Sequence, residues 1–470
     1  MNYYIIPKNN FNIKIDLLIN PNKINPFISY SLIHFLNDIY SQLLNINIEA
    51  EKETEIEIKK GSTNDTILEF INKIVNPFEF IHTNVPGSFL SVSKVKPSSN
   101  IFFELMEVFQ VCNIIELLSL KNQIHISHIT KNNTSTTYLM DMLRENNNDI
   151  ITTHNFEFDS LCEKFITNID SINKSDVFLF EFDESDYINT DTYIKNMILV
   201  LYIVIKYQAS NGICIIKMDN IFYKTIVDIL FIFSAIYERV LIIKPSISKI
   251  TKGERYLICK NLNMDILNNT RLFLQLDEII KPMIINKLFN NTNIHSLIKN
   301  DIPYYFSNKI EESNAVIGQQ QLEAYDQILN ILKSKNKNDK IEILKRNHIQ
   351  KCIQWCEKNQ LPHNKFIDKL NIFLNVKQKE FNEKIVQFDS DSNSNSDSDS
   401  NSDSNSNSNN NSNNSNNNSN NSNNNDSNND NNNNSNSDIV NIVNTIVNNV
   451  VNTIVNTIVN ELDSSILFEK

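Results

Sequence analysis

Short β-rich runs alternate with helical patterns between residues 61 and 262, and this alternation constrains the fold more than any other feature of the sequence. Alternating strands and helices favour an α/β fold, in which helices flank a largely parallel central sheet. The expected strands are 78–83, 123–130, 176–182, 212–218, 239–243 and 255–260. The expected helices are 64–75, 103–118, 156–168, 191–208 and 221–237.

The rest of the chain divides around this region. Residues 1–60 are interpreted as an N-terminal cap, and residues 263–388, which show helical periodicity with many charges, as a helical appendage. Residues 389–438 are an Asn/Ser/Asp tract that cannot bury a core, so we expect it to be disordered. The Ile/Val/Asn repeat in residues 439–470 is either a codon-repeat expansion without function, which composition favours, or a helix for self-association.

Charge and cysteine content limit the classes of function. The net charge of the whole chain is −12, but most of it lies in the tail, and residues 1–388 carry about −2. A nucleic-acid partner must therefore be inferred from local patches rather than from net charge. The six cysteines are scattered without metal-ligand spacing, so we expect no metal site and a reducing, intracellular setting.

The N-terminus lacks the layout of a signal peptide, and the longest apolar runs, 197–205 and 226–236, are too short to span a bilayer. We therefore expect no membrane association and a cytoplasmic location.

A proline-glycine loop follows the first expected strand. It comprises Asn84, Val85, Pro86, Gly87, Ser88 and Phe89, and a helix is expected after it. The loop after the first strand of a doubly wound sheet is where nucleotide-like ligands bind, and glycine lets the backbone approach such a ligand. A plain turn is the alternative, which the Pro-Gly pair taken alone favours.

Two further segments carry candidate chemistry. Lys217 ends a very apolar strand, where a lysine is unusual unless it has a role or reaches for solvent. The segment from 238 to 262 reads as strand, basic loop and strand, with Glu254 the only acid between Lys244 and Lys260. This loop is either a solvated hairpin or a basic rim for an RNA backbone. The proposed RNA contacts are Lys244, Lys249, Lys252 and Arg255.

The order PGSF, GICIIKMD and KPSISKITKGERYLIC resembles the FtsJ-like ribose methyltransferases. The third element matches that family best, through Lys244-Pro245, Ser248-Lys249 and Gly253-Glu254-Arg255-Tyr256. Within the family the chain looks most like the versions of large cytoplasmic DNA viruses, close to the cap-methylating Adrift-type enzymes. The resemblance covers residues 61–262 well and 263–370 loosely. It implies a Rossmann-like methyltransferase domain with S-adenosyl-L-methionine as cofactor, bound by the loop Asn84–Phe89, and a viral factory or the virion as the location.

The family also implies a Lys-Asp-Lys-Glu catalytic tetrad. Lys217 and Glu254 match its last two members. Its aspartate position falls on Glu181 or Asp183, which point to the same face of the expected strand.

The first lysine of the tetrad is expected in the helix before the loop. That segment offers Lys60 before its start and Lys73 near its end. The cofactor loop also carries Ser88 where the family has a second glycine.

These matches imply an RNA 2'-O-ribose methyltransferase that acts on RNA, with mRNA caps as one candidate substrate. A lysine can help remove the hydroxyl proton if its pKa is lowered by a second cation or by burial. Without the first lysine, Lys217 would hold its proton more firmly. The incomplete tetrad keeps a second hypothesis open: a catalytically weakened, methyltransferase-like subunit that binds RNA or serves as a scaffold.

Overall fold

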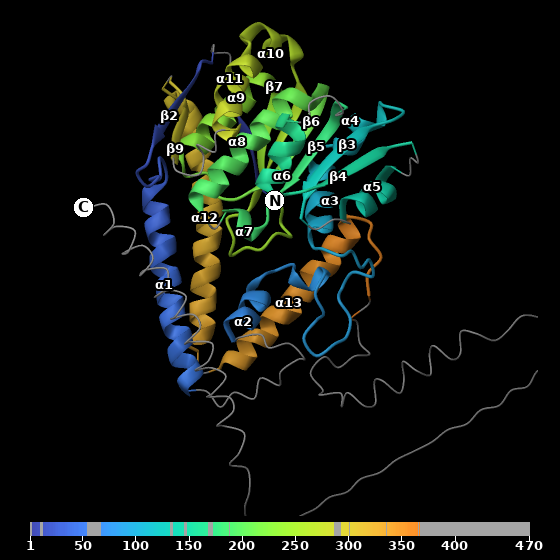
Figure 1. Ribbon diagram of the computed structural model, residues 1–470. Coiled ribbons are helices and arrows are strands. Elements are labelled where there is room, and N and C mark those ends of the chain that lie inside the picture. The colour runs from blue at the N-terminus through green and yellow to red at the C-terminus, as the bar shows by residue number, and fades with distance from the viewer. Residues whose placement is uncertain are drawn as a thin grey trace, which may run out of the picture. The chain divides into compact units, whose positions relative to one another are not determined.

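A seven-stranded sheet with the order β1–β7–β8–β6–β5–β3–β4 forms the centre of the structure, which is a computed structural model (Figure 1). A second sheet pairs β2 (Ile15–Asn20) with β9 (Asn293–Ile298). The structure describes residues 2–9, 13–53, 67–131, 135–144, 148–167, 173–187, 189–285, 293–299, 301–334, 336–364 and 366.

The central sheet is parallel on one side and antiparallel on the other. Its strands are β1 (Asn2–Ile6), β3 (His125–Thr130), β4 (Ile150–Asn155), β5 (Ser175–Glu181), β6 (Gln208–Met218), β7 (Tyr237–Lys244) and β8 (Arg255–Leu262). The pairs β4–β3, β3–β5 and β5–β6 are parallel, whereas β8 runs antiparallel to both β6 and β7, and β1 antiparallel to β7. Because β8 is the reversed strand between β6 and β7, those two strands point the same way.

Helices cover both faces of this sheet because its central strands are apolar on both sides. In β5, Phe178 and Phe180 pack into one core cluster, and Val177 and Leu179 into another. The first cluster includes α8 (Thr190–Tyr207) and α9 (Lys224–Ile236), which are buried almost all round. The second includes α3 (Ile101–Val111), α4 (Ile114–Ser119), α5 (Ser135–Arg144) and α13 (Lys337–Lys358). This is the layer order of a Rossmann-like α/β fold.

Two long helices lie side by side beyond the sheet: α1 (Tyr30–Glu53) and α12 (Tyr304–Leu332) (Figure 1). With α2 (Ile67–Val75) and α13 they enclose a third apolar cluster. The remaining helices are α6 (Phe158–Cys162), the π-helical turn Glu163–Thr167, α7 (Glu184–Tyr187), α10 (Met264–Thr270) and α11 (Leu272–Ile285).

The predicted Rossmann-like α/β class, with a mostly parallel sheet between helices and a helical C-terminal part, is confirmed, because five of the seven central strands point the same way. The expected strands from 123 onward are present, while β1, β2, β4 and β9 were not anticipated. The predicted tract 389–438 and repeat 439–470 lie outside the described residues.

One expected strand, 78–83, is wrong. These residues form a 3-10 turn, Glu79–Ile81, and β3 pairs directly with β5 in the sheet. Phe80 and Ile81 are buried with Trp355 of α13, so packing against the C-terminal helix holds this apolar segment outside the sheet. The loop Asn84–Phe89 therefore follows a helical turn rather than a strand.

The contact between α1 and α12 predicts the effect of filling Gly318. A Cβ atom at Gly318 would lie 2.3 Å from Cδ1 of Leu32 on α1, so Gly318→Ala must push that side chain away. We expect a net loss of up to about 2 kcal/mol, because overpacking outweighs the better helix propensity of alanine. Urea denaturation measures this change in the free energy of unfolding. Adding Leu32→Ala to Gly318→Ala should restore stability. A stabilised single variant would contradict the packing argument.

Candidate active site

Three polar side chains form a row across three neighbouring central strands, at the end of the sheet where β5 and β6 finish. Glu181 at the end of β5 is in register with Lys217 of β6, and Lys217 is in register with Tyr256 of β8. Residues in register project from the same face of a sheet, which here is the face covered by α3. The row is buried, and Lys217 is only 8% exposed.

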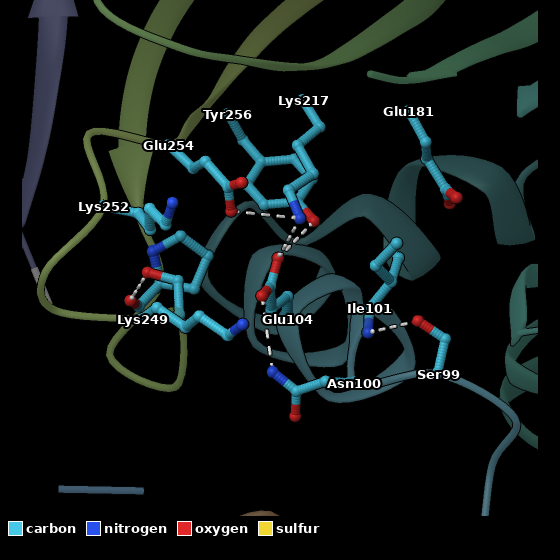
Figure 2. Close-up of polar contacts among 12 residues, drawn as sticks. Ser99, Asn100, Ile101, Glu104, Glu181, Lys217, Lys249, Lys252, Glu254 and Tyr256 are labelled. Atoms are coloured by element: carbon cyan, nitrogen blue, oxygen red, sulfur yellow. Dashed lines mark hydrogen bonds and ion pairs between the residues drawn. The ribbon is translucent and has the colours of Figure 1, made fainter. Parts of the chain in front are cut away.

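Two carboxylates hold the Lys217 ammonium. Its Nζ lies 3.3 Å from Oε2 of Glu254, which directly precedes β8, and 3.4 Å from Oε2 of Glu104 on α3 (Figure 2). Both carboxylates are largely buried. The structure thus brings Lys217 and Glu254 together as predicted from the sequence and adds Glu104, which had not been singled out.

Tyrosine hydroxyls complete this network. Tyr256 donates to Oε2 of Glu104 over 2.7 Å, and Tyr187 of α7 donates to Oε1 of Glu254. Asn100, at the start of α3, lies 3.4 Å from the other oxygen of Glu104 (Figure 2). The one signal for Glu104 in the sequence is its place in the apolar run IFFELMEVF, since glutamate is rarely buried without a partner.

The carboxylates determine the charge state of Lys217. Burial alone would lower the pKa of Lys217, but Glu104, Glu254 and Glu181 outweigh burial, so the pKa is raised above its usual range. Burial also acts to raise the pKa of Glu254, yet Lys217 and the Tyr187 hydroxyl lower it. At neutral pH Lys217 is therefore an ammonium beside ionised Glu254.

Glu181 and Asp183 lie in different environments. The Glu181 carboxylate is buried, 2.9 Å from Nε2 of His128, and accepts a 3.0 Å hydrogen bond from Thr130. Asp183 is exposed, and its side chain accepts from the backbone N–H of Glu184 at the start of α7. Of the two candidates for the aspartate position, Glu181 is the one placed beside Lys217.

The other candidates lie elsewhere. Lys60 is outside the described residues. Lys73 belongs to α2, which packs with α1, α12 and α13. The loop Asn84–Phe89 makes a tight turn with Gly87 at φ 84°, and Phe89 is half exposed. Hydrogen bonds from Lys94 to Pro362 and from Asn364 to Val92 tie the chain after this loop to the segment after α13.

Two of the four expected RNA contacts are wrong, because Lys244 and Arg255 are buried. Lys244 donates to the carbonyls of Lys249, Lys252 and Glu254, which fixes the loop between β7 and β8. Burial, with Arg255 nearby, lowers the pKa of Lys244 to about 8. Arg255 donates to Gly253 and Asn314, so neither cation faces solvent.

The other two basic residues reach the surface. Lys249 is exposed, and Lys252 forms an ion pair of 2.5 Å with Glu184. The Gly253 backbone packs closely against the side chain of Asn220: a Cβ atom at Gly253 would lie 2.1 Å from Oδ1 of Asn220. Glycine at 253 therefore allows the turn that brings the next residue, Glu254, to Lys217.

Within the described ranges, no group of three or more His, Cys, Asp or Glu residues could hold a metal ion. A separate search of the same ranges finds no helix with the length and apolar character needed to cross a membrane.

The chain matches no known family model, and no curated protein matches it. Similar solved structures include a ribosomal RNA methyltransferase from Plasmodium falciparum, with 17% identity and a TM-score of 0.27 over 35% of this chain and 98% of that one. Another is the aspartate aminotransferase of Plasmodium falciparum, with 12% identity and a TM-score of 0.16 over 74% of this chain and 72% of that one. Neither likeness is strong enough to carry an argument about function.

Removing the buried ammonium should destabilise the protein in a pH-dependent way. Lys217→Met leaves Glu104 and Glu254 facing each other in a buried site, and breaking such a pair costs about 3–5 kcal/mol. The stranded carboxylates should have raised pKa values in the folded state, so part of the loss should be regained as the pH falls from about 8 to about 5. Denaturant titrations at both pH values measure the stability of the variant relative to the wild type.

Lys252→Met, at an exposed pair, is the control and should show a small loss of stability at both pH values. A small, pH-independent loss in Lys217→Met would contradict the buried network.

Proposed function

We propose that the chain is an S-adenosylmethionine-dependent RNA 2'-O-ribose methyltransferase. The observation that carries the proposal is the convergence of Lys217, Glu254 and Glu181 at the carboxyl end of β5 and β6. In open α/β sheets, ligands bind outside the carboxyl ends of the parallel strands. Lys217 and Glu254 are the residues that match the FtsJ-like pattern, and Glu181 stands at its aspartate position.

The charges of the site suit this cofactor. Three carboxylates, Glu104, Glu181 and Glu254, act on the single ammonium of Lys217. Burial acts against the charge of the neighbouring Asp219, Lys244 and Arg255, because it raises the pKa of Asp219 and lowers the pKa values of Lys244 and Arg255. A surplus of buried negative charge favours a cationic ligand, and the sulfonium of S-adenosylmethionine is cationic. When bound, it would supply the methyl group.

The chain connects the expected cofactor loop to this cluster. After Asn84–Phe89 the next helix is α3, and Glu104 lies in its first turn. The positive φ of Gly87 and the exposure of the loop leave its backbone accessible. The loop does not follow a strand, so cofactor contacts by Asn84, Pro86, Gly87, Ser88 and Phe89 stay a prediction.

The raised pKa of Lys217 changes the role proposed for it. As a stable ammonium, Lys217 would orient the ribose 2'-oxygen and stabilise the negative charge that develops on it. The hydroxyl proton would then pass to a carboxylate. Glu254 is the best placed because it contacts Lys217, and its lowered pKa keeps it ionised at neutral pH, although it also makes it a weak base. Glu181 would help to hold the ammonium in position.

RNA remains the proposed substrate, with the mRNA cap as the narrower candidate implied by the resemblance. Lys249 is exposed on the loop that ends at Glu254. A phosphate bound there would lie on the same loop as the proposed proton acceptor. The viral assignment likewise follows from the resemblance only.

A second candidate function is a weakened, RNA-binding subunit of the same fold. The specific observation in its favour is Glu104 of α3, whose carboxylate already pairs with the Lys217 ammonium. Such a subunit would bind cofactor or RNA without transferring a methyl group.

Transfer of labelled methyl groups from S-adenosylmethionine to capped and uncapped RNA decides between the two. We expect Lys217→Ala and Glu254→Gln to reduce the rate at saturating cofactor by about a hundredfold to ten-thousandfold. Glu181→Gln should also slow transfer, whereas Asp183→Asn, the matched control two residues away, should not. If the wild-type chain binds RNA and cofactor but transfers no methyl group, the weakened subunit is correct. Full activity in Lys217→Ala would overturn the assigned site.

RNA binding itself should depend on Lys249. Lys249→Ala should weaken binding to single-stranded RNA and reduce the slope of log affinity against log salt by about 0.7, the value for one lost phosphate contact. Lys14, exposed near β2, provides the control, and Lys14→Ala should leave both quantities unchanged. Fluorescence anisotropy over a series of salt concentrations measures them. An unchanged slope in Lys249→Ala would remove this loop from the RNA interface.

A further inference from the structure

Helix α1 has two apolar stripes, and the described part of the structure covers only one of them. The first stripe packs against α12 and contains Ile39, Leu43 and Ile46. At 3.6 residues per turn, a second set of side chains lies about a third of a turn away from the first. The members of this second stripe follow one another at alternating intervals of three and four residues: Tyr30, Ile33, Asn37, Tyr40 and Leu44.

The second stripe is exposed. Tyr30 is 61% exposed, Tyr40 47% and Leu44 41%. Ile33 is half-buried and Asn37 is exposed. Within the described residues α1 packs against α12 and, more lightly, α2, and it lies at the margin of the described structure beside α12 (Figure 1). Monomeric proteins rarely expose large contiguous apolar patches, and such patches commonly mark a contact with another molecule.

The surface of α1 is also almost uncharged. Between residues 30 and 48 the sequence has a single charged side chain, Asp38. Asp38 lies outside the second stripe and accepts a hydrogen bond from Gln42. Surface helices normally carry charged residues on the side away from the core. The composition of α1 therefore indicates a side that does not stay in solvent, and a partner that covers it should itself be apolar and uncharged.

We propose that the second stripe of α1 binds the same stripe of a second copy of this chain, in a parallel, two-stranded coiled coil. Alternating intervals of three and four residues are those of the a and d positions of a heptad, the pattern through which two helices interlock. In a parallel pair each residue of the stripe meets its own copy. Tyr30, Tyr40 and Leu44 would then each bury apolar surface against an identical side chain.

Asn37 is the observation that favours an identical partner. It occupies the middle of the stripe, at the same heptad position as Tyr30 and Leu44. In a parallel pair the two Asn37 amides face each other, and each can satisfy the other because an amide both donates and accepts. A single asparagine at such a position specifies register and two strands, at a cost in stability. An apolar partner of another kind would leave the amide buried without a hydrogen bond, which native structures rarely tolerate.

The length of the stripe sets the strength expected of the contact. From Tyr30 to Leu44 the stripe spans two heptads, or about 21 Å of helix at 1.5 Å per residue. An interface of this size lies at the low end of specific protein contacts, so we expect a reversible dimer with a Kd on the order of 10 μM.

Sedimentation-velocity ultracentrifugation of the full chain, over concentrations that bracket this Kd, tests the proposal. The wild type should pass from monomer to dimer as its concentration rises. Tyr30→Ser and Leu44→Ser should each raise the Kd at least about tenfold, because each removes an apolar side chain from both copies. Phe35→Ser is the matched control and should leave the Kd unchanged, since Phe35 is 57% exposed on the same helix but lies outside the stripe.

Two further variants test the register. Asn37→Ile should tighten association and allow species larger than dimers, because it removes the polar pair that selects two strands. Leu44→Cys should form a disulfide with its own copy under mild oxidation, since a parallel pair brings the two Cα atoms within disulfide range. The native cysteines are all buried and should not compete. Cross-linking of a Tyr30→Cys chain to a Leu44→Cys chain, without a link between two Leu44→Cys chains, would contradict the parallel register.

A wild type that stays monomeric at every concentration would overturn the proposal. So would a dimer whose Kd is unchanged in both Tyr30→Ser and Leu44→Ser, a result that places self-association elsewhere, for instance in the repeat of residues 439–470. Because neither cofactor nor RNA is present in these measurements, their outcome is independent of the proposed methyl transfer.

Discussion

The register between β5, β6 and β8 is the constraint on which the rest of the site depends. It aligns Glu181, Lys217 and Tyr256 in one buried row. An ammonium buried alone would be too costly, so the row requires carboxylates close to it. The structure supplies them from two further directions, with Glu104 from the helix that covers the sheet and Glu254 from the loop before β8. Shifting any one strand by one residue would turn its member of the row to the other face.

The loop before β8 is held by groups that look solvated in the sequence. Lys244 binds three carbonyls inside the loop, and Arg255 binds Asn314 of α12 on the opposite face of the sheet from Tyr256. A basic loop read from sequence alone suggests an RNA-binding surface, because charge is usually exposed. Here two of its four cations are structural, and their burial fixes the position of Glu254. The same loop thus combines an internal scaffold with one exposed lysine, Lys249.

The parts of the fold that the sequence predicts are those set by local pattern. The apolar strands β5, β6, β7 and β8 and the helices α8 and α9 lie close to their expected ranges, and Lys217 is conspicuous at the end of an apolar run. Segment 78–83 has the same apolar pattern but forms a 3-10 turn, because Phe80 and Ile81 pack against a helix more than 250 residues later in the chain. Glu104 was missed for a related reason, since its partners Lys217 and Tyr256 become neighbours only through the fold.

The balance of charge around Lys217 decides what chemistry the row can perform. A lysine that accepts a proton needs a nearby cation or an apolar site to lower its pKa, and here three carboxylates raise it instead. Such a lysine is better suited to hold an oxygen and to stabilise negative charge on it than to remove a proton. Glu104, Glu181 and Glu254 then have two functions that do not conflict. They keep Lys217 charged, and together they give the site negative charge that favours a cation. The proposed reaction would use this balance to hold a cationic methyl donor beside a hydroxyl, and it would require Glu104, which now pairs with Lys217, to move aside.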